Sequence, residues 1–234
     1  MVRSIQNFRN DLNRLYAMGF RPVTLHDYVN NRMKLPRGAS PVVITFDDSD
    51  PSQLTLKADG TVHPHTAVGI WMSFKRKYPE FPIKGTFFVL PNGPFGQRKL
   101  VDRKIEILTN YGCEIGSHTL SHRSLAKLTD EEVIAEIAGS YEYLRSIGVE
   151  AKSFATPYGI APKNRDLLTK SVFNGRTFGY ENICLAGAGP APSPFSPKFD
   201  RHRIPRIKAY DGPLGITYWQ NRESNGKLDV YVQL

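Results

Sequence analysis

Four side chains in this sequence have the types and the spacing to bind and use a divalent cation. Asp47 and Asp48 are adjacent acids, and His118 and His122 stand four residues apart. Adjacent carboxylates repel one another unless a cation or hydrogen-bond donors hold them, so the acid pair suggests acid chemistry. Taken alone, the segment from Asp47 to Pro51 is equally well explained as a solvated turn, because Asp, Ser and Pro are common turn residues.

The histidine pair favours a metal site over a solvated turn. Side chains at i and i+4 on a helical turn lie about 5–6 Å apart at their Cβ atoms, so both imidazoles could reach one ion. Asp48 would supply the third, charged ligand, and two histidines with one carboxylate leave a coordination position open, as catalytic sites do. A lone His-x-x-x-His is weak evidence, since exposed helical pairs are common, but together with the Asp-Asp pair it predicts a metal site.

Buried strands are needed to bring these side chains together. Residues 42–46 form an apolar and β-branched run without alternation, which is typical of a strand buried on both faces in a parallel sheet. Residues 85–90 form a second such strand, and 113–116 return the chain to the sheet just before the histidines. The carboxyl ends of parallel strands meet at one edge, where α/β folds place their chemistry.

Helical patterns alternate with the expected strands. Apolar residues recur at helical spacing over 4–18, 66–78, 102–111 and 129–148, with Ser4 as a predicted cap and Thr129 with Glu132 as a capping box. Asp59-Gly60 predicts a small inserted hairpin within 54–63. The other expected elements are a short helix after Thr24, a helix over 162–170, a Pro- and Gly-rich loop over 187–198, and strands near 152–155, 177–179, 183–186, 203–207, 214–219 and 228–232.

Composition excludes several classes of protein. With 234 residues and 40% of them hydrophobic, the chain can bury one core, so a single α/β domain over 1–234 is expected. No apolar run is long enough for a membrane span, and residues 1–20 are charged instead of carrying a signal-peptide core. Two cysteines imply no disulfide framework, and the +9 net charge is scattered without a nucleic-acid-binding motif. The charge would suit an anionic surface such as a bacterial wall, or simply a soluble basic surface.

Three segments resemble a known family. Thr45-Phe46-Asp47-Asp48, Gly85-Thr86-Phe87-Phe88, and the run from Glu114 to His122 are similar, in order and spacing, to the first motif, second strand and second motif of the NodB-type polysaccharide deacetylases, carbohydrate esterase family four. The resemblance runs from about residue 40 to 160 and more weakly to about 220. Phe154-Ala155-Thr156-Pro157-Tyr158-Gly159 is similar to the third motif of the poly-N-acetylglucosamine deacetylase branch.

The resemblance implies a distorted (β/α)7-type barrel, the NodB homology fold, and one divalent metal ion, usually zinc, with cobalt or nickel as alternatives. The ion would be held by Asp48, His118 and His122, while Asp47 acts as general base and the backbone N–H of Tyr158 completes an oxyanion site. A divalent ion lowers the pKa of bound water from 15.7 toward about 7, so a carboxylate can take its proton.

The implied function is removal of N-acetyl groups from a polysaccharide that contains N-acetylglucosamine, by a metal-dependent hydrolase. The implied location is secreted or at the cell envelope; the given chain carries no signal peptide, and a cytoplasmic location stays open. Two other functions fit the same residues. One is a glycan- or wall-binding module with little or no turnover, and the other is an amidohydrolase that cleaves a small non-sugar C–N bond.

Two residues of the family pattern are missing here. The arginine that hydrogen-bonds the general base is replaced by Ala155, and Arg203 or Arg206 could return a guanidinium from another strand; Arg206 is our candidate, although both arginines could equally face solvent. No histidine ends the late strand expected over 214–219. An amine cannot leave unprotonated, so an acid is required, and His202 is our candidate for it. His63 and His65 are alternatives, and each of the three alone could be a plain surface histidine.

Overall fold

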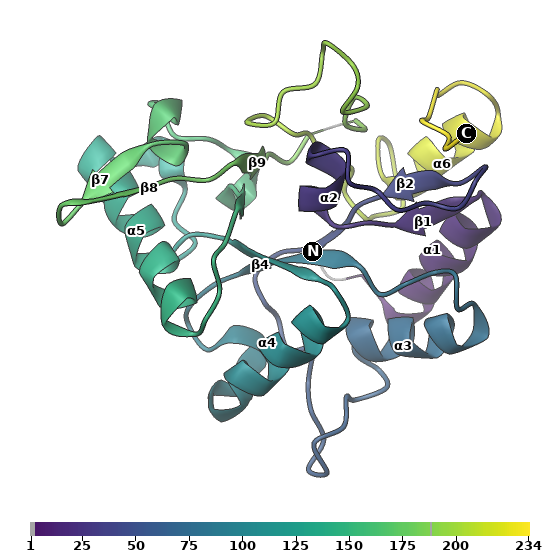
Figure 1. Ribbon diagram of the computed structural model, residues 1–234, viewed down its shortest axis with the longest axis horizontal. Helices are drawn as coiled ribbons and strands as arrows, with labels where there is room; N and C mark the ends of the chain where they lie inside the picture. The colour runs from purple at the N-terminus through teal and green to yellow at the C-terminus, as the bar shows by residue number, and fades with distance from the viewer. Residues whose placement is uncertain (1–2, 188) are drawn as a thin grey trace.

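A computed structural model describes residues 3–187 and 189–234, with a curled sheet of five parallel strands at its centre (Figure 1). Neighbouring strands of this sheet all run parallel. In order across the sheet, the strands are β3 (Ile44–Phe46), β4 (Gly85–Val89), β5 (Glu114–Ser117), β6 (Ser153–Ala155) and β9 (Asn182–Cys184). The predicted α/β class with a barrel-like parallel sheet is therefore confirmed, in the form of a half-barrel.

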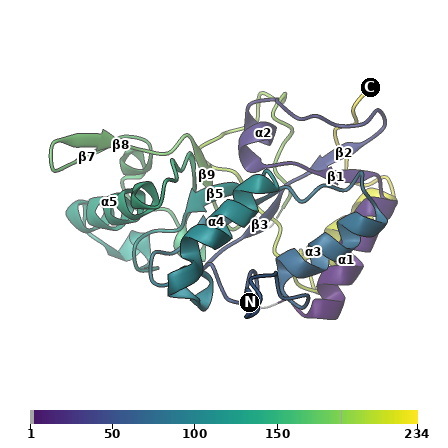
Figure 2. The same cartoon turned by 60° about the horizontal axis from the view of Figure 1, so that its bottom comes forward.

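Helices connect the successive strands. One helix follows each of β3, β4 and β5, which is the repeated β/α unit that the sequence predicts, and α1 packs beside α3 on the outside (Figure 2). Within the described residues, no helix combines the length and the apolar character needed to cross a membrane. The helices are α1 (Ile5–Ala17), α2 (Leu25–Val29), α3 (Ala67–Lys77), α4 (Val101–Asn110), α5 (Asp130–Ser146) and α6 (Ile216–Ser224). Short 3₁₀ turns are η1 (Pro94–Gly96), η2 (Arg98–Leu100), η3 (Leu125–Lys127), η4 (Pro157–Gly159) and η5 (Arg165–Leu168).

Side-chain caps start several helices where the sequence predicts them. The Ser4 hydroxyl accepts a hydrogen bond from the backbone N–H of Asn7 at 3.1 Å, and α1 begins at the next residue after Ser4. Thr129 and Glu132 form the predicted capping box at the start of α5. Each cap satisfies backbone N–H groups that have no partner inside the helix, so these boundaries are set locally.

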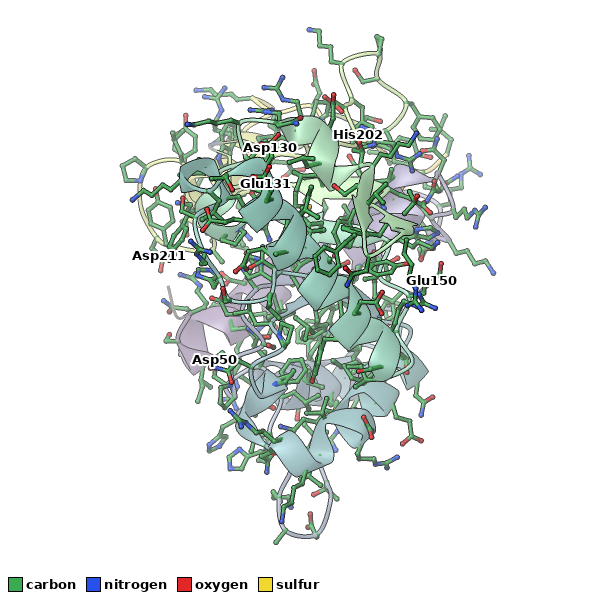
Figure 3. All side chains as sticks on the ribbon, turned by 90° about the vertical axis from the view of Figure 1, so that its left-hand side faces the viewer. Asp50, Asp130, Glu131, Glu150, His202 and Asp211 are labelled. Carbon is green, nitrogen blue, oxygen red and sulfur yellow. The ribbon has the colours of Figure 1, made fainter. Side chains whose placement is uncertain are left out.

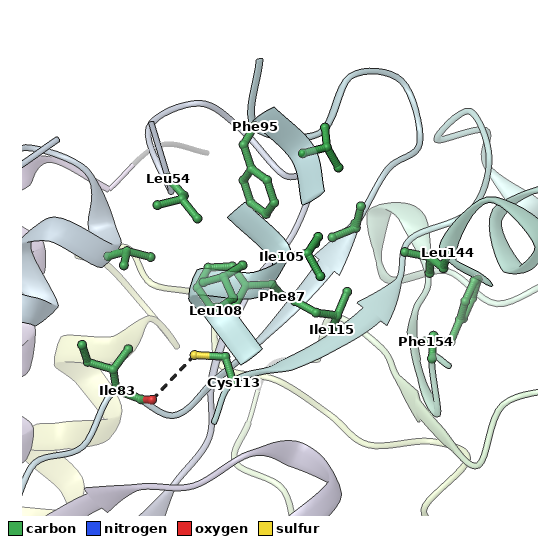
Figure 4. Packing of buried hydrophobic residues seen from close by; sticks show 14 of the residues in the cluster. Leu54, Ile83, Phe87, Phe95, Ile105, Leu108, Cys113, Ile115, Leu144 and Phe154 are labelled. Carbon is green, nitrogen blue, oxygen red and sulfur yellow. Dashed lines mark hydrogen bonds between the residues drawn. The ribbon is translucent and has the colours of Figure 1, made fainter. Parts of the chain in front are cut away.

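The core lies between the sheet and the connecting helices. Phe87 of β4 and Ile115 of β5 pack in one hydrophobic cluster with Ile105 and Leu108 of α4 (Figure 4). Cys113 belongs to the same cluster, is unpaired, and places its Sγ 3.6 Å from the Ile83 carbonyl oxygen. Burial raises the pKa of the Cys113 thiol to about 11, so this cysteine behaves as a small apolar residue, as predicted.

The expected central strand over 42–46 is divided. β2 (Ser40–Val42) pairs with β1 (Phe20–Pro22), whereas β3 pairs with β4, so the chain changes partner at Val43. The prediction that this strand is buried on both faces is wrong, because its residues are only half-buried. The reason is that β3 is the edge strand of the curled sheet and has a paired neighbour on one side alone.

The C-terminal third departs most from the prediction. Residues 216–224 form the helix α6 where a strand was expected, and residues 228–232 form no strand. In the expected strand over 203–207, one bridge joins Ile204 to Cys184. Pro205 follows it directly and has no N–H to donate to a ladder, which explains why the pairing stops there.

Three smaller elements also differ. The predicted hairpin over 54–63 is reduced to one antiparallel bridge between Leu56 and Val62, at the base of the loop that hangs below the body in Figure 1. Residues near 177–179 join no central sheet, since β7 (Ser171–Phe173) and β8 (Arg176–Phe178) form their own antiparallel hairpin. The helix expected over 162–170 is only the 3₁₀ turn η5.

Candidate metal centre

The side chains predicted to do chemistry gather at the carboxyl edge of the parallel sheet. Asp47 and Asp48 follow β3, His118 follows β5, and Arg206 lies two residues beyond the bridge between Ile204 and β9. Because parallel strands all end at the same edge, residues far apart in the sequence are brought together there.

Asp48, His118 and His122 offer three ligand atoms to one point. The Nε2 atoms of His118 and His122 lie 3.2 and 3.3 Å from Oδ1 of Asp48. The three donor atoms all lie within 4.8 Å of one another, and no other such group of three or more occurs in residues 3–187 and 189–234. His118 is 2% exposed while the Asp48 side chain is 54% exposed, so the cluster opens to solvent on the Asp48 side.

The surroundings of both histidines suit a metal. Nδ1 of His118 lies 2.8 Å from the Ala155 carbonyl oxygen and must donate to it, so Nε2 is the ring nitrogen that faces the cluster and would bind an ion. Burial, helped by neighbouring His118, lowers the pKa of His122 and favours its neutral form. Two neutral imidazoles and one carboxylate form a donor set that zinc and similar ions bind, so the residues present fit a divalent ion.

The two histidines are brought together by a non-helical turn, whereas the sequence predicts a helical one. His118 and His122 do not lie on a helical turn; Thr119 and His122 have positive φ angles of 70° and 60°. The Thr119 hydroxyl accepts the backbone N–H of His122 at 3.0 Å, and Glu136 of α5 accepts the N–H of Ser121 at 2.9 Å. This braced turn brings the two rings to a centroid distance of 5.0 Å.

Backbone strain concentrates at this edge. Nine described residues other than glycine have positive φ, and five of them are at the cluster. A positive φ in a residue with a Cβ costs of order 1–3 kcal/mol and persists only where surrounding contacts enforce it. The concentration therefore points to a pre-organised site. The five residues are Asp48, Ser49, Thr119, His122 and Tyr158.

Asp47 is held by Arg206. Two N–H groups of the guanidinium donate to the two carboxylate oxygens of Asp47 at 2.7 and 2.8 Å, and Arg206 also donates to the Thr45 hydroxyl at 3.1 Å. Burial would raise the pKa of Asp47, but the charge and hydrogen bonds of Arg206 outweigh it and hold the pKa below its usual value. Arg203, the other candidate, is exposed on the surface.

Tyr158 lies against the histidine pair at His122. Its ring packs edge-on against His122 with a centroid distance of 4.7 Å, and the side chain is 63% exposed. Tyr158 has a φ of 59°, and its backbone N–H makes no hydrogen bond to any other described residue. A backbone N–H without a partner is what the predicted oxyanion role requires.

His202 does not join the cluster of ligand atoms and is exposed on the surface. It stands two residues before the Ile204 bridge, whereas Arg206 stands two residues after it, and only the latter side faces the carboxyl edge. In Figure 3 His202 lies near the top, well apart from Asp50, which closely follows the metal-ligand candidate Asp48. Sequence reasoning had only residue type to support His202, and its surface position is the plain alternative.

The two alternative candidates for the acid also remain outside the cluster. His63 and His65 lie on the insert after Asp50, with their rings 5.4 Å apart, and neither belongs to the group of ligand atoms. One neighbour of the site was missed by the sequence analysis. The buried side-chain amide of Gln53 donates to the backbone carbonyl of Asp47, and nothing in its sequence context signals this contact.

Comparison with known proteins places this site in a family. The sequence model described as polysaccharide deacetylase matches residues 34–174, more than half of the chain, and this match includes every residue of the acid and histidine pairs. The chain belongs to the polysaccharide deacetylase family. The match ends before Arg206, so the arginine is contributed by a segment outside the matched part.

Two curated relatives of this deacetylase-family chain match parts of it. The peptidoglycan-N-acetylglucosamine deacetylase of Bacillus cereus is 29% identical over 131 residues, which are 56% of this chain and 40% of that protein. Chitin deacetylase 1 of Cryptococcus neoformans is 35% identical over 80 residues, 33% of this chain and 16% of that protein. The chain thus spans less than half the length of the curated relatives it matches.

A solved structure shares the fold. The Streptococcus pyogenes deacetylase PplD, determined in complex with acetate, aligns with a TM-score of 0.60 at 17% identity, covering 87% of this chain and 80% of that one. At this identity the likeness concerns the fold, and it confirms the predicted deacetylase architecture with its curled parallel sheet.

Proposed function

We propose that this chain is a metal-dependent hydrolase that removes N-acetyl groups from N-acetylglucosamine units of a polysaccharide. The observation that carries the proposal is the pairing of Asp47 with Arg206 immediately beside the ligand cluster of Asp48, His118 and His122. This arrangement places an oriented carboxylate, which can take a proton, next to a site that can hold a cation. Zinc is the proposed ion, with cobalt and nickel as alternatives.

The bound ion would polarise the acetamide carbonyl and make a water molecule acidic near neutral pH. Asp47 takes the proton from the attacking water, and Arg206 keeps Asp47 ionised and fixes its orientation. The backbone N–H of Tyr158 donates to the carbonyl oxygen as negative charge develops on it.

The departing amine also needs a proton. His202 is not placed to give one, so we assign this step to Asp47, which carries a proton after accepting it from water. One carboxyl group would then serve first as base and then as acid. The amine leaves protonated on the sugar, and acetate is the second product.

The names of the relatives support the substrate class in this proposal, because chitin and peptidoglycan both contain N-acetylglucosamine. A wall polymer as substrate would place the protein at the cell envelope or outside the cell, which belongs to the same proposal. The scattered positive charge would favour an anionic polymer surface.

The proposal is tested by acetate release from chitin oligomers, β-1,6-linked N-acetylglucosamine polymer and peptidoglycan after loading with zinc, cobalt or nickel. We expect release from at least one polymer, loss of release in Asp47→Asn, and no change in the surface control His202→Gln. Polymer binding without acetate release from any of them would instead favour a glycan-binding module. Release from small non-sugar amides only would favour an amidohydrolase.

A further inference from the structure

Lys104 of α4 is a buried cation outside the site described above. It is 0% exposed, and in the described part of the chain its Nζ donates to a single acceptor, the Phe95 carbonyl oxygen at 2.7 Å, with no carboxylate partner. Burial lowers the pKa of Lys104 to about 8, so the amine is mostly charged at neutral pH. Burying an ammonium group without a counter-ion costs free energy, which suggests that its hydrogen bond to Phe95 has a role in the fold.

Phe95 is itself under strain. It is fully buried, yet its φ is 58°, a conformation that a bulky residue rarely adopts. Both polar groups of its backbone are used: the carbonyl accepts from Lys104, and the N–H donates to the Ser49 carbonyl oxygen at 2.6 Å. The ring packs in the same hydrophobic cluster as Ile105 and Leu108 of α4 (Figure 4).

Ser49 directly follows the ligand candidate Asp48, and these two residues have positive φ angles of 47° and 70°. The Ser49 hydroxyl accepts the backbone N–H of Leu90 at 3.2 Å, which ties the turn to the end of β4. The carbonyl of Ser49 gives this turn a further contact, because it accepts the backbone N–H of Phe95.

We infer that Lys104 is a positioning residue for the metal centre, because it holds Phe95 in a strained conformation whose N–H fixes the turn that carries Asp48. This inference rests on the proposed function. Lys104 touches neither ion nor substrate and acts through Phe95 and Ser49 alone. Without the ammonium, Phe95 could relax to a negative φ, its N–H would turn away from Ser49, and the Asp48 carboxylate would lose its fixed direction.

The test is zinc affinity, measured without substrate by competition with a chromophoric chelator. Lys104→Met keeps the length and apolar stem of the side chain but removes the donor. Groups that orient metal ligands typically change affinity by about 10–100-fold, so we expect the dissociation constant for zinc to rise by about tenfold or more. Circular dichroism and thermal melting report on folding independently.

Leu108→Ala is the matched control, since it removes buried contacts from the same helix while keeping the hydrogen bond from Lys104 to the Phe95 carbonyl. It should lower the melting temperature and leave the zinc dissociation constant of the folded protein unchanged. A wild-type zinc affinity in folded Lys104→Met, or an equal loss of affinity in Leu108→Ala, would overturn the inference. Because no substrate is present, a failed deacetylase assay does not affect this result.

The wild-type chain provides a second test should Lys104→Met not fold. The backbone N–H of Phe95 should exchange with deuterium as slowly as the buried amides of α4, because it is bonded to Ser49 inside the core. Exchange as fast as at a freely exposed loop amide would show that the contact does not hold the turn, and the inference would fail.

Discussion

Replacing Arg206 by methionine is the sharpest perturbation of the proposed machinery. Arg206→Met keeps a long apolar side chain but removes the two charge-assisted hydrogen bonds to Asp47, at 2.7 and 2.8 Å. Asp47 would remain beside Asp48 in a partly buried position, without the partner that most favours its charged form.

The size of the effect follows from these contacts. A hydrogen bond to a charged group contributes about 1.5–3 kcal/mol, but water can partly replace the lost donors. The Asp47 side chain is 31% exposed against 16% for Arg206, so such replacement is expected. We therefore expect a loss of about 2–3 kcal/mol in transition-state stabilisation, or roughly 30–150-fold in kcat/KM.

The pH profile provides an independent signature. Burial raises the pKa of Asp47 and Arg206 lowers it, with the arginine dominant in the wild-type chain. Removal of Arg206 takes away the main influence that opposes burial, so the pKa of Asp47 rises and less of it is ionised at a given acidic pH. The acid limb of kcat/KM should therefore move to higher pH in Arg206→Met.

The assay is acetate release as a function of pH, with zinc affinity as a parallel measurement. Arg206→Lys is the matched control: one ammonium keeps the charge but cannot make the forked contact, so it should recover part of the rate and most of the acid-limb position. If Arg206→Met kept kcat/KM within about threefold of wild type with an unchanged acid limb, the assignment of Arg206 would be refuted.

Three further outcomes are expected. Asp47→Asn should bind zinc normally and lose about 10²–10⁴-fold in acetate release; weakened zinc binding would instead make Asp47 a ligand. Tyr158→Ala retains its backbone N–H, so its kcat should fall by less than the roughly 10²–10³-fold typical of a lost oxyanion donor, and a larger fall would mean that the side chain acts directly. Thr129→Ala should lower the free energy of unfolding in urea by about 1 kcal/mol through loss of the α5 cap, without changing zinc affinity.

Local sequence signals predicted the parts of this molecule that depend on neighbouring residues. The Ser4 cap and the Thr129 capping box are set within one turn of helix, and both were predicted correctly. The meeting of Asp48 with the histidines also could be predicted, because parallel strands end at a common edge whatever the details of the connecting turns.

The remaining parts depend on contacts that no local pattern encodes. The position of Arg206 follows from a single bridge at Ile204, and the turn around Thr119 needs a positive φ that a β-branched residue rarely adopts. Lys104 would be expected to face solvent, as lysines on amphipathic helices usually do. After residue 200, proline and glycine interrupt the hydrophobic periodicity, so the sequence predicts a strand over 214–219 where the structure has the helix α6.

The central claim, that Asp48, His118 and His122 hold one catalytic cation, is tested most directly by anomalous diffraction at the zinc edge from crystals grown with zinc. The account predicts one strong peak about 2.0–2.2 Å from a carboxylate oxygen of Asp48 and from Nε2 of both histidines. A map with no peak among these three side chains, or with the ion bound elsewhere in the chain, would contradict it.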